Sequence, residues 1–149
     1  MQLRWHERAF GELGVDELYA IVALRERVFI VEQTCVYLDA DGLDPAARHL
    51  WAAAGDAIHA YLRVVPAGAK FAEVSIGRVI VAPERRGTGL GKELMQRGLA
   101  IAGEVAVRIS AQAHLQKFYR ELGFAAVSDV YDEDGIPHLE MLRAAPAER

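Results

Sequence analysis

The pattern of hydrophobic and polar positions is clearest in the middle of the chain, on either side of a run of glycines. Residues 73–81 (EVSIGRVIV) are rich in β-branched side chains and largely alternate in polarity, which predicts a strand. Pro83 ends it, because proline offers no N–H to a strand ladder. From Leu90 to Ala102 apolar and small residues recur every four positions, as in an amphipathic helix. The pattern therefore predicts a strand, a glycine loop and a helix in succession.

The remaining elements are shorter and are separated by turn-forming residues. Asp16 is predicted as the N-cap of a helix that continues to about Glu32, and a loop rich in aspartate follows over residues 34–48. The other predicted strands span residues 2–8, 49–54, 57–65, 105–110, 124–130 and 138–142, with a short helix at 114–122 and a connector at 131–137. Hairpins and helical crossovers both occur, so we expect one α/β domain with a mixed central sheet. The domain is expected to cover residues 1–143, and residues 144–149 to form a frayed tail.

The glycine loop is a candidate anion site. It reads Arg85-Arg86-Gly87-Thr88-Gly89-Leu90-Gly91-Lys92. Glycines at a helix entrance let backbone N–H groups converge on one point, and the helix N-terminus adds about half a positive charge there. The flanking basic residues reinforce that sign, so the loop favours phosphate or pyrophosphate. A P-loop is excluded because Glu93 stands where its hydroxyl residue would be, and the glycine spacing does not fit a dinucleotide fingerprint. The alternative is a turn that only lets the strand and helix pack closely.

Composition and charge narrow the class of protein. A chain of 149 residues suits one domain, and a net charge of −4 argues against a nucleic-acid platform, which carries a basic face. The single cysteine, Cys35, excludes an internal disulfide and a Cys-rich zinc site. None of the five histidines has the spacing of a helical metal site, so we expect no metal. The chain shows neither an apolar signal region nor a stretch of membrane-spanning length, so we expect a cytoplasmic protein without membrane partners.

Two motifs in this order of elements are shared with a known family. They are the R-x-x-G-x-G loop at 86–91 and an F-Y-x-x-x-G-F segment at 118–124. Together they resemble the GNAT superfamily of acyl-CoA-dependent N-acyltransferases. Four further stretches, 28–37, 39–44, 111–116 and 133–138, are similar to its ElaA branch. The resemblance extends to about Arg143 and implies a GNAT-like single domain, with about six to seven strands flanked by helices.

The resemblance also implies a donor and a reaction. Acetyl-CoA, or a related acyl-CoA, would transfer its acyl group directly to a primary amine in a ternary complex. Its pyrophosphate would bind the loop at Arg86, Gly87, Thr88, Gly89, Gly91 and Lys92. The pantetheine arm would pair with the strand backbone near Val79 and Val81 and contact Gln112, where many members carry an asparagine. A non-catalytic acyl-CoA sensor is the alternative function.

Tyr119 stands at the family position of the acid that protonates the departing thiolate. A phenol stays protonated at neutral pH and can donate to the sulfur. The structural alternative is a core aromatic residue whose hydroxyl is satisfied by the protein. The position that often carries a strand glutamate as general base falls near Ser75, and serine cannot act there unaided. The residue that removes the proton of the amine is therefore left open.

Two acidic runs, neither of which contains a lysine or arginine, are expected to border the acceptor. The first comprises Glu32, Asp39, Asp41 and Asp44, and the second lies at 129–134, ahead of His138. Such carboxylates would attract a cationic amine, although aspartates also serve ordinary turns. The predicted substrate-binding residues are Glu32, Asp39, Asp41 and His138, with an orienting role favoured for the histidine. The acceptor is expected to be a small-molecule or peptide amine, and a homodimer is the one assembly considered.

Overall fold

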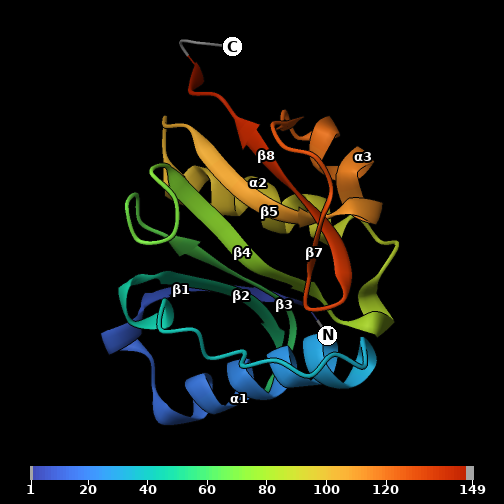
Figure 1. Ribbon diagram of the computed structural model, residues 1–149. Helices are drawn as coiled ribbons and strands as arrows, with labels where there is room; N and C mark the ends of the chain where they lie inside the picture. Colours follow the sequence, from blue (N-terminus) through green and yellow to red (C-terminus); the bar gives the residue numbers. More distant parts are fainter. Residues whose placement is uncertain (1, 147–149) are drawn as a thin grey trace.

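The strand-forming segments assemble into a single eight-stranded sheet in the computed structural model, which describes residues 2–146 (Figure 1). The strands are β1 (Arg4–Ala9), β2 (Arg48–Ala54), β3 (Ala57–Val65), β4 (Val74–Val81), β5 (Val107–Gln112), β6 (Ala125–Ala126), β7 (Tyr131–Glu133) and β8 (Ile136–Arg143). Their order across the sheet is β1-β2-β3-β4-β5-β8-β6, and β7 also pairs with β8. The expected mixed sheet flanked by helices is confirmed. Part of the expected tail, residues 147–149, lies outside the described residues.

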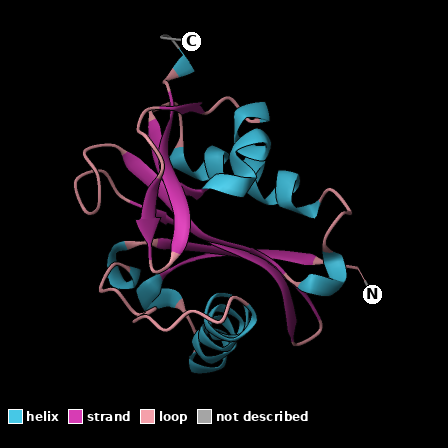
Figure 2. Cartoon of the chain, turned by 45° about the vertical axis from the view of Figure 1, so that its right-hand side comes forward, coloured by secondary structure: helices cyan, strands magenta, loops and turns pink. Residues whose placement is uncertain are grey.

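Helices cover both faces of this sheet (Figure 2). On one face, α1 (Val15–Arg25) buries Ile21 and Leu24 against Trp51 and Tyr61. On the other face lie α2 (Leu90–Ala102) and α3 (Gln116–Glu121). Helix α1 continues into a π-helical segment, Glu26–Glu32, whose wider turns carry the chain toward the end of β4. Short 3-10 turns complete the fold at Phe10–Glu12, Asp44–Ala46, Pro83–Arg85 and Ala113–Leu115.

The seam between β4 and β5 is unusually short. All the other strand pairs are antiparallel, whereas β4 and β5 run parallel and are connected through α2. The parallel register comprises two residue pairs, Val74 with Val107 and Ser75 with Arg108. Beyond these two pairs the strands separate, so their carboxyl-terminal halves are not bonded to each other. A binding space can therefore form inside the sheet, between its two halves.

Three sequence predictions about the elements are wrong. The helix begins at Val15 rather than after an N-cap at Asp16, because the Glu17 carboxylate accepts a hydrogen bond of 2.9 Å from the Gly14 N–H and satisfies that end. The strand predicted over 124–130 is only two residues long, because the segment leaves the ladder after Ala126. The connector predicted over 131–137 is instead the β7–β8 hairpin, with Asp134 and Gly135 at the positive φ angles that such a turn requires.

Candidate active site

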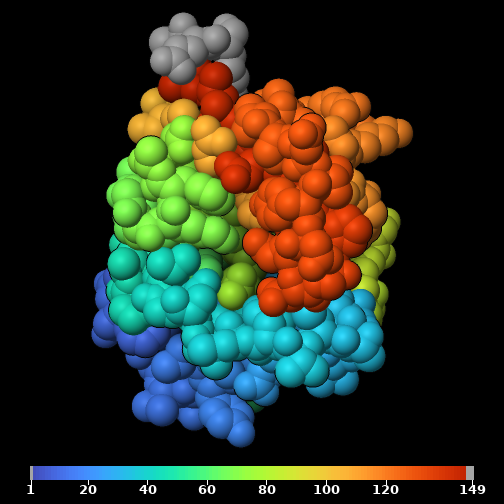
Figure 3. Space-filling view, in the orientation of Figure 1, coloured from blue at the N-terminus to red at the C-terminus, as the bar shows by residue number. Residues whose placement is uncertain are grey.

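A cavity of about 970 Å³ opens where β4 and β5 separate. Its walls come from the π-helical segment after α1, from β4, from the glycine loop, from the end of β5, from α3 and from the β7–β8 hairpin. In Figure 3 the hairpin, coloured orange to red, rests against the cyan segment that follows α1. The two segments are joined by a hydrogen bond of 2.9 Å, which the thiol of Cys35 donates to the carbonyl of Asp134 in the hairpin turn. This contact closes one side of the cavity.

The glycine loop forms the cavity wall at the start of α2. Gly87 and Gly89 have φ angles of 78° and 86°, in the left-handed region that favours glycine. Gly89 is the N-cap of α2, and no side chain of the described residues caps this helix end. Several N–H groups of the first turn are therefore left for a ligand. Lys92 also lines the cavity, whereas Thr88 turns its hydroxyl back to the Arg85 carbonyl at 2.6 Å.

Arg86 is already engaged with a carboxylate. Its guanidinium makes two bonds to Glu32, of 2.6 and 3.0 Å, and a third of 3.0 Å to the Val81 carbonyl. The hydrogen bond from Arg86 lowers the pKa of Glu32. Arg86 is predicted to bind the donor and Glu32 the acceptor, yet the two form one ion pair at the cavity. A phosphate that binds Arg86 would therefore compete with Glu32.

Strand β4 is irregular where it faces the cavity. Gly77 pairs with Arg63 and Ile80 pairs with Tyr61, so two residues of β4 lie opposite one of β3. This is a β-bulge, and within it Arg78 has a φ of 52°. Such a bulge leaves backbone groups outside the β3 ladder. Val79 and Val81, the predicted partners of the pantetheine arm, both line the cavity in this stretch.

Tyr119 lies on α3, at the inner end of the cavity wall. The residue is 6% exposed and packs edge-on against Phe118 and Phe124, with ring centroids 5.1 and 6.0 Å away. Its hydroxyl makes no hydrogen bond to another residue of the described chain, and the residue lines the cavity. Burial raises the pKa of the phenol to about 12. The hydroxyl is therefore protonated at neutral pH and free to donate to a ligand.

The end of β5 and the β7–β8 hairpin form the opposite wall. The Gln112 amide donates to Gln33 at 3.4 Å, which brings the π-helical segment next to β5. His138 is buried and places its Nε2 atom 3.3 Å from the Glu133 carboxylate. Gln112, Gln33, Glu133 and His138 all line the cavity.

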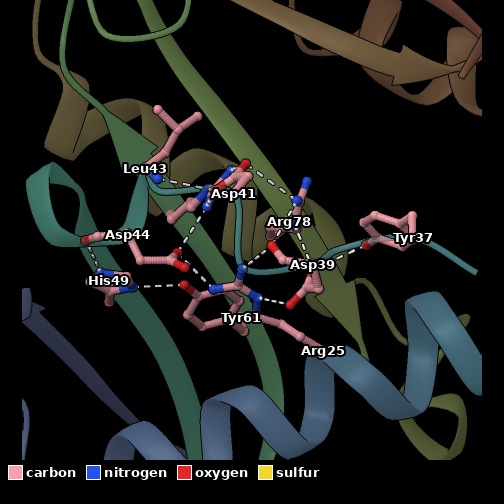
Figure 4. A network of polar contacts seen from close by, with 10 residues as sticks. Arg25, Tyr37, Asp39, Asp41, Leu43, Asp44, His49, Tyr61 and Arg78 are labelled. Carbon is pink, nitrogen blue, oxygen red and sulfur yellow. Dashed lines mark hydrogen bonds and ion pairs between the residues drawn. The ribbon is translucent and has the colours of Figure 1, made fainter. Parts of the chain in front are cut away.

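The carboxylates of the first acidic run, which are predicted to attract a cationic amine, are each paired with an arginine. Asp39, Asp41 and Asp44 are interleaved with three arginines from other elements (Figure 4). Arg25 contacts Asp39 at 2.8 Å and Asp44 at 2.7 Å. Asp39 and Asp41 are predicted to bind the substrate. Both carboxylates contact guanidinium groups, and Asp41 also lines the cavity.

The other two arginines complete the network. Arg63 bonds Asp41 and Asp44, and Arg78 contacts Asp39 at 2.8 Å and Asp41 at 3.3 Å. Burial by itself would raise the pKa of Asp41, but hydrogen bonds and charge from Arg63 outweigh it and lower the pKa. Three carboxylates and three guanidiniums thus cancel, and the segment that carries Tyr37 and Asp41 is fixed against the cavity wall.

Comparison with known proteins places the chain in a family. A model of the acetyltransferase (GNAT) domain matches residues 25–144, most of the chain. Protein ElaA of Escherichia coli is 42% identical over 147 residues, which cover 95% of this chain and 96% of ElaA. The chain belongs to the GNAT acetyltransferase family.

Two solved GNAT structures superimpose closely on this one. The crystal structure of an acyl-CoA N-acyltransferase from Pseudomonas aeruginosa has a TM-score of 0.91 and 44% identity, and covers 96% of this chain and 100% of its own. The crystal structure of Escherichia coli ElaA has a TM-score of 0.89 and 40% identity, covering 95% and 99%. The resemblance to the ElaA branch and the GNAT fold are both confirmed.

Not every predicted residue reaches the cavity of this GNAT domain. Most of the residues predicted to bind acetyl-CoA line one cavity, as do Tyr119, Glu32, Asp41 and His138. Thr88 and Asp39 are not part of that lining. Ser75, the position that often holds the family's glutamate base, is buried on β4 in the short paired seam with β5 and is also outside the lining. Gln33 and Lys70, which the sequence did not single out, are part of it.

The described residues hold no cluster of three or more potential ligands that could bind a metal ion. Residues 2–146 also contain no helix that is both long and apolar enough to cross a bilayer.

Proposed function

We propose that this GNAT protein transfers an acetyl group from acetyl-CoA to a primary amine. One observation carries the proposal: the uncapped start of α2 and the unpartnered hydroxyl of Tyr119 line the same cavity between the separated strands. The cavity, about 970 Å³, is at the upper end of the usual range for ligand pockets, so it can take an extended donor together with an acceptor.

The glycine loop would hold the donor by its phosphates. Free N–H groups of the first turn of α2 and the positive end of the helix dipole favour a pyrophosphate there. Lys92 adds a positive charge at the same wall. The amides of the pantetheine arm would then reach the bulged part of β4 near Val79 and the amide of Gln112, both of which face the cavity.

Tyr119 would assist the departure of the sulfur. A thiol has a pKa near 8.5, and burial raises the pKa of this phenol to about 12, so full proton transfer from the phenol to a thiolate would be unfavourable. The phenol would instead donate a hydrogen bond as negative charge develops on the sulfur. The proton that ends on the thiol then comes from the attacking nitrogen, and no acyl-enzyme is required.

The placement of the donor is tested with Gly89→Asp. An aspartate there would block the approach of a phosphate to the backbone and add a negative charge, so the affinity for CoA measured by calorimetry should fall at least about tenfold. Gly68→Asp is the matched control, since Gly68 has a similar φ of 87° but does not line the cavity. Equal CoA affinity of the two folded variants would refute the placement.

The activity itself is tested by following free thiol from acetyl-CoA with a panel of primary amines. Release that depends on the amine supports the transferase, whereas tight CoA binding without release under any condition would favour the acyl-CoA sensor. Donors with longer acyl chains, compared in the same assay, test the choice of acetyl. The cytoplasmic location, the identity of the amine and the homodimer stay predictions.

A further inference from the structure

The transfer reaction needs a group that removes a proton from the acceptor ammonium, and the β7–β8 hairpin supplies a candidate. The register pairs Glu133 with Ile136 and Tyr131 with His138. Residues directly opposite each other in a hairpin share a face, as do alternate residues along one strand. These four side chains therefore lie on one face of the hairpin. Of the four, Glu133, Ile136 and His138 line the cavity.

The hydrogen bonds of His138 define where its protons can be. Its Nδ1 atom lies 2.7 Å from the Ile136 carbonyl, which can only accept, so Nδ1 carries a hydrogen. Its Nε2 atom faces Oε2 of Glu133 at 3.3 Å. If neither of these two atoms carried a proton, two lone pairs would face each other. A hydrogen on either atom can be accepted by the other, so the contact orients the Glu133 carboxylate toward the histidine.

The other oxygen of Glu133 points to β5. Its Oε1 atom is 3.5 Å from the Ser110 hydroxyl, which in turn contacts the Tyr131 hydroxyl at 2.5 Å. Ser110 lies two residues before Gln112, and residues i and i+2 on one strand are roughly 7 Å apart on the same face. The carboxylate thus lies near Gln112, which is proposed to contact the pantetheine arm of the donor. Its side chain is 43% exposed, which gives a proton a route to water.

Resting on the proposed function, we propose that Glu133 is the catalytic base that deprotonates the acceptor amine and that His138 is a positioning residue for it. A bound ammonium loses one proton to Oε1 of Glu133, which passes it to solvent. The neutral nitrogen then forms the N–C bond as the C–S bond breaks. A second proton moves from this nitrogen to the departing sulfur, so the products are an amide and free CoA thiol.

The charged and titratable groups around the pair come from every element packed against it. They are Tyr131 on β7, Asp134 in the hairpin turn, Glu140 on β8 with its partner Arg108 on β5, Lys70 before β4, and Cys35 after the π-helical segment. Glu140 is held by Arg108 at 3.0 Å, and the thiol of Cys35 is bonded to the Asp134 carbonyl. Four carboxylates of the described residues line the cavity, and two of them are paired, Glu32 with Arg86 and Asp41 with Arg63. Of the other two, Asp134 lies in the hairpin turn, whereas Glu133 reaches Ser110 on β5, so Glu133 is the better placed to accept a proton.

The test compares Glu133→Gln with wild type in steady-state acylation by acetyl-CoA over a range of pH. The probes are spermidine, 2-phenylethylamine and lysine amide, and the best of these acceptors is used. The variant should lose about 10²-fold or more in kcat near pH 7, while its acetyl-CoA affinity stays within about twofold. Its deficit should shrink as the pH rises toward the pKa of the free amine, because solution then supplies the neutral acceptor without a base. Asp129→Asn, which removes one exposed carboxylate of the same acidic run outside the cavity lining, should behave as wild type.

A second acceptor separates proton removal from a structural role. Trifluoroethylamine is already neutral at pH 7 and needs no base for its first proton, so with it the deficit of Glu133→Gln should shrink to less than about tenfold. His138→Asn, which loses the contact from Nε2 to Glu133, should change the pH profile with a smaller loss of kcat, as expected of a positioning residue.

The outcomes separate the two claims. A wild-type protein that acylates none of these amines would overturn the proposed function, and the inference would fall with it. An active wild type together with a Glu133→Gln variant that keeps its rate and pH profile would overturn the inference alone. An equal loss with ionised and neutral acceptors would also overturn it, since a damaged fold rather than a missing base would then explain the loss.

Discussion

Removing the guanidinium of Arg25 would expose how much the buried network contributes to stability. The residue is 2% exposed and donates to Asp39 at 2.8 Å and to Asp44 at 2.7 Å. Arg25→Met keeps the apolar stem but leaves two carboxylates short of a partner. Breaking a buried ion pair on one side costs about 3–5 kcal/mol of unfolding free energy. We expect the lower end, about 3 kcal/mol, because Asp39 keeps Arg78 and Asp44 keeps Arg63.

The assay is equilibrium urea unfolding at pH 7, with thermal unfolding beside it. For a domain of this size each kcal/mol shifts Tm by about 2–4 °C, so Tm should fall by roughly 6–12 °C. Arg27→Met is the matched control. The Arg27 side chain is 53% exposed, and its guanidinium lies 3.5 Å from the carboxylate of Glu84, whose side chain is equally exposed. Its loss should cost less than about 1 kcal/mol. Equal costs for the two variants, or a cost below about 1 kcal/mol for Arg25→Met, would refute the view that the network stabilises the fold.

Two further predictions concern the phenol and the network. Tyr119→Phe should lower the rate of single-turnover acylation by roughly 10²-fold. Its acetyl-CoA affinity and urea midpoint should stay unchanged, because the hydroxyl has no partner among the described residues. An unaltered single-turnover rate would contradict the role of the phenol. Arginine contacts lower the pKa of Asp41 and Asp44 below the unfolded value near 3.9, so their stabilisation is complete above that pH and is lost as pH falls through the folded pKa values. Urea unfolding should therefore give a free energy that declines as the pH falls below about 4; a constant value between pH 4 and pH 3 would contradict it.

The elements that are determined by residues close together in the sequence could be predicted from it. The strand ending near Val81, the glycine loop and the helix to Ala102 are a local pattern, and the structure places them within a residue or two. The hairpin of β2 and β3 was equally accessible, since two strand patterns flank a short turn. The glycine loop and Tyr119 could be related to one site only through the family resemblance, because no local pattern brings the two segments together.

What the sequence did not reveal depends on partners far along the chain. Asp39 looked like part of an unpaired acidic run, yet its arginine partners are 14 and 39 residues away. Glu133 and His138 face each other only because the turn at Asp134 sets the register of the hairpin. Aspartate is used both in exposed turns and in buried ion-pair networks. The sequence alone therefore does not distinguish the two uses, and only the three-dimensional pairing does.

The short seam between β4 and β5 also bears on how the protein avoids aggregation. Past Ser75 and Arg108 each of these strands has a stretch of edge that its neighbour does not use, and exposed strand edges invite pairing with other chains. These edges lie in the middle of the sheet, beneath the hairpin that Cys35 anchors through the Asp134 carbonyl. Their place inside the sheet makes them less open to a strand from another chain than a free outer edge would be. The molecule can thus keep an open hydrogen-bonding edge for a ligand without offering it as a template for fibre growth.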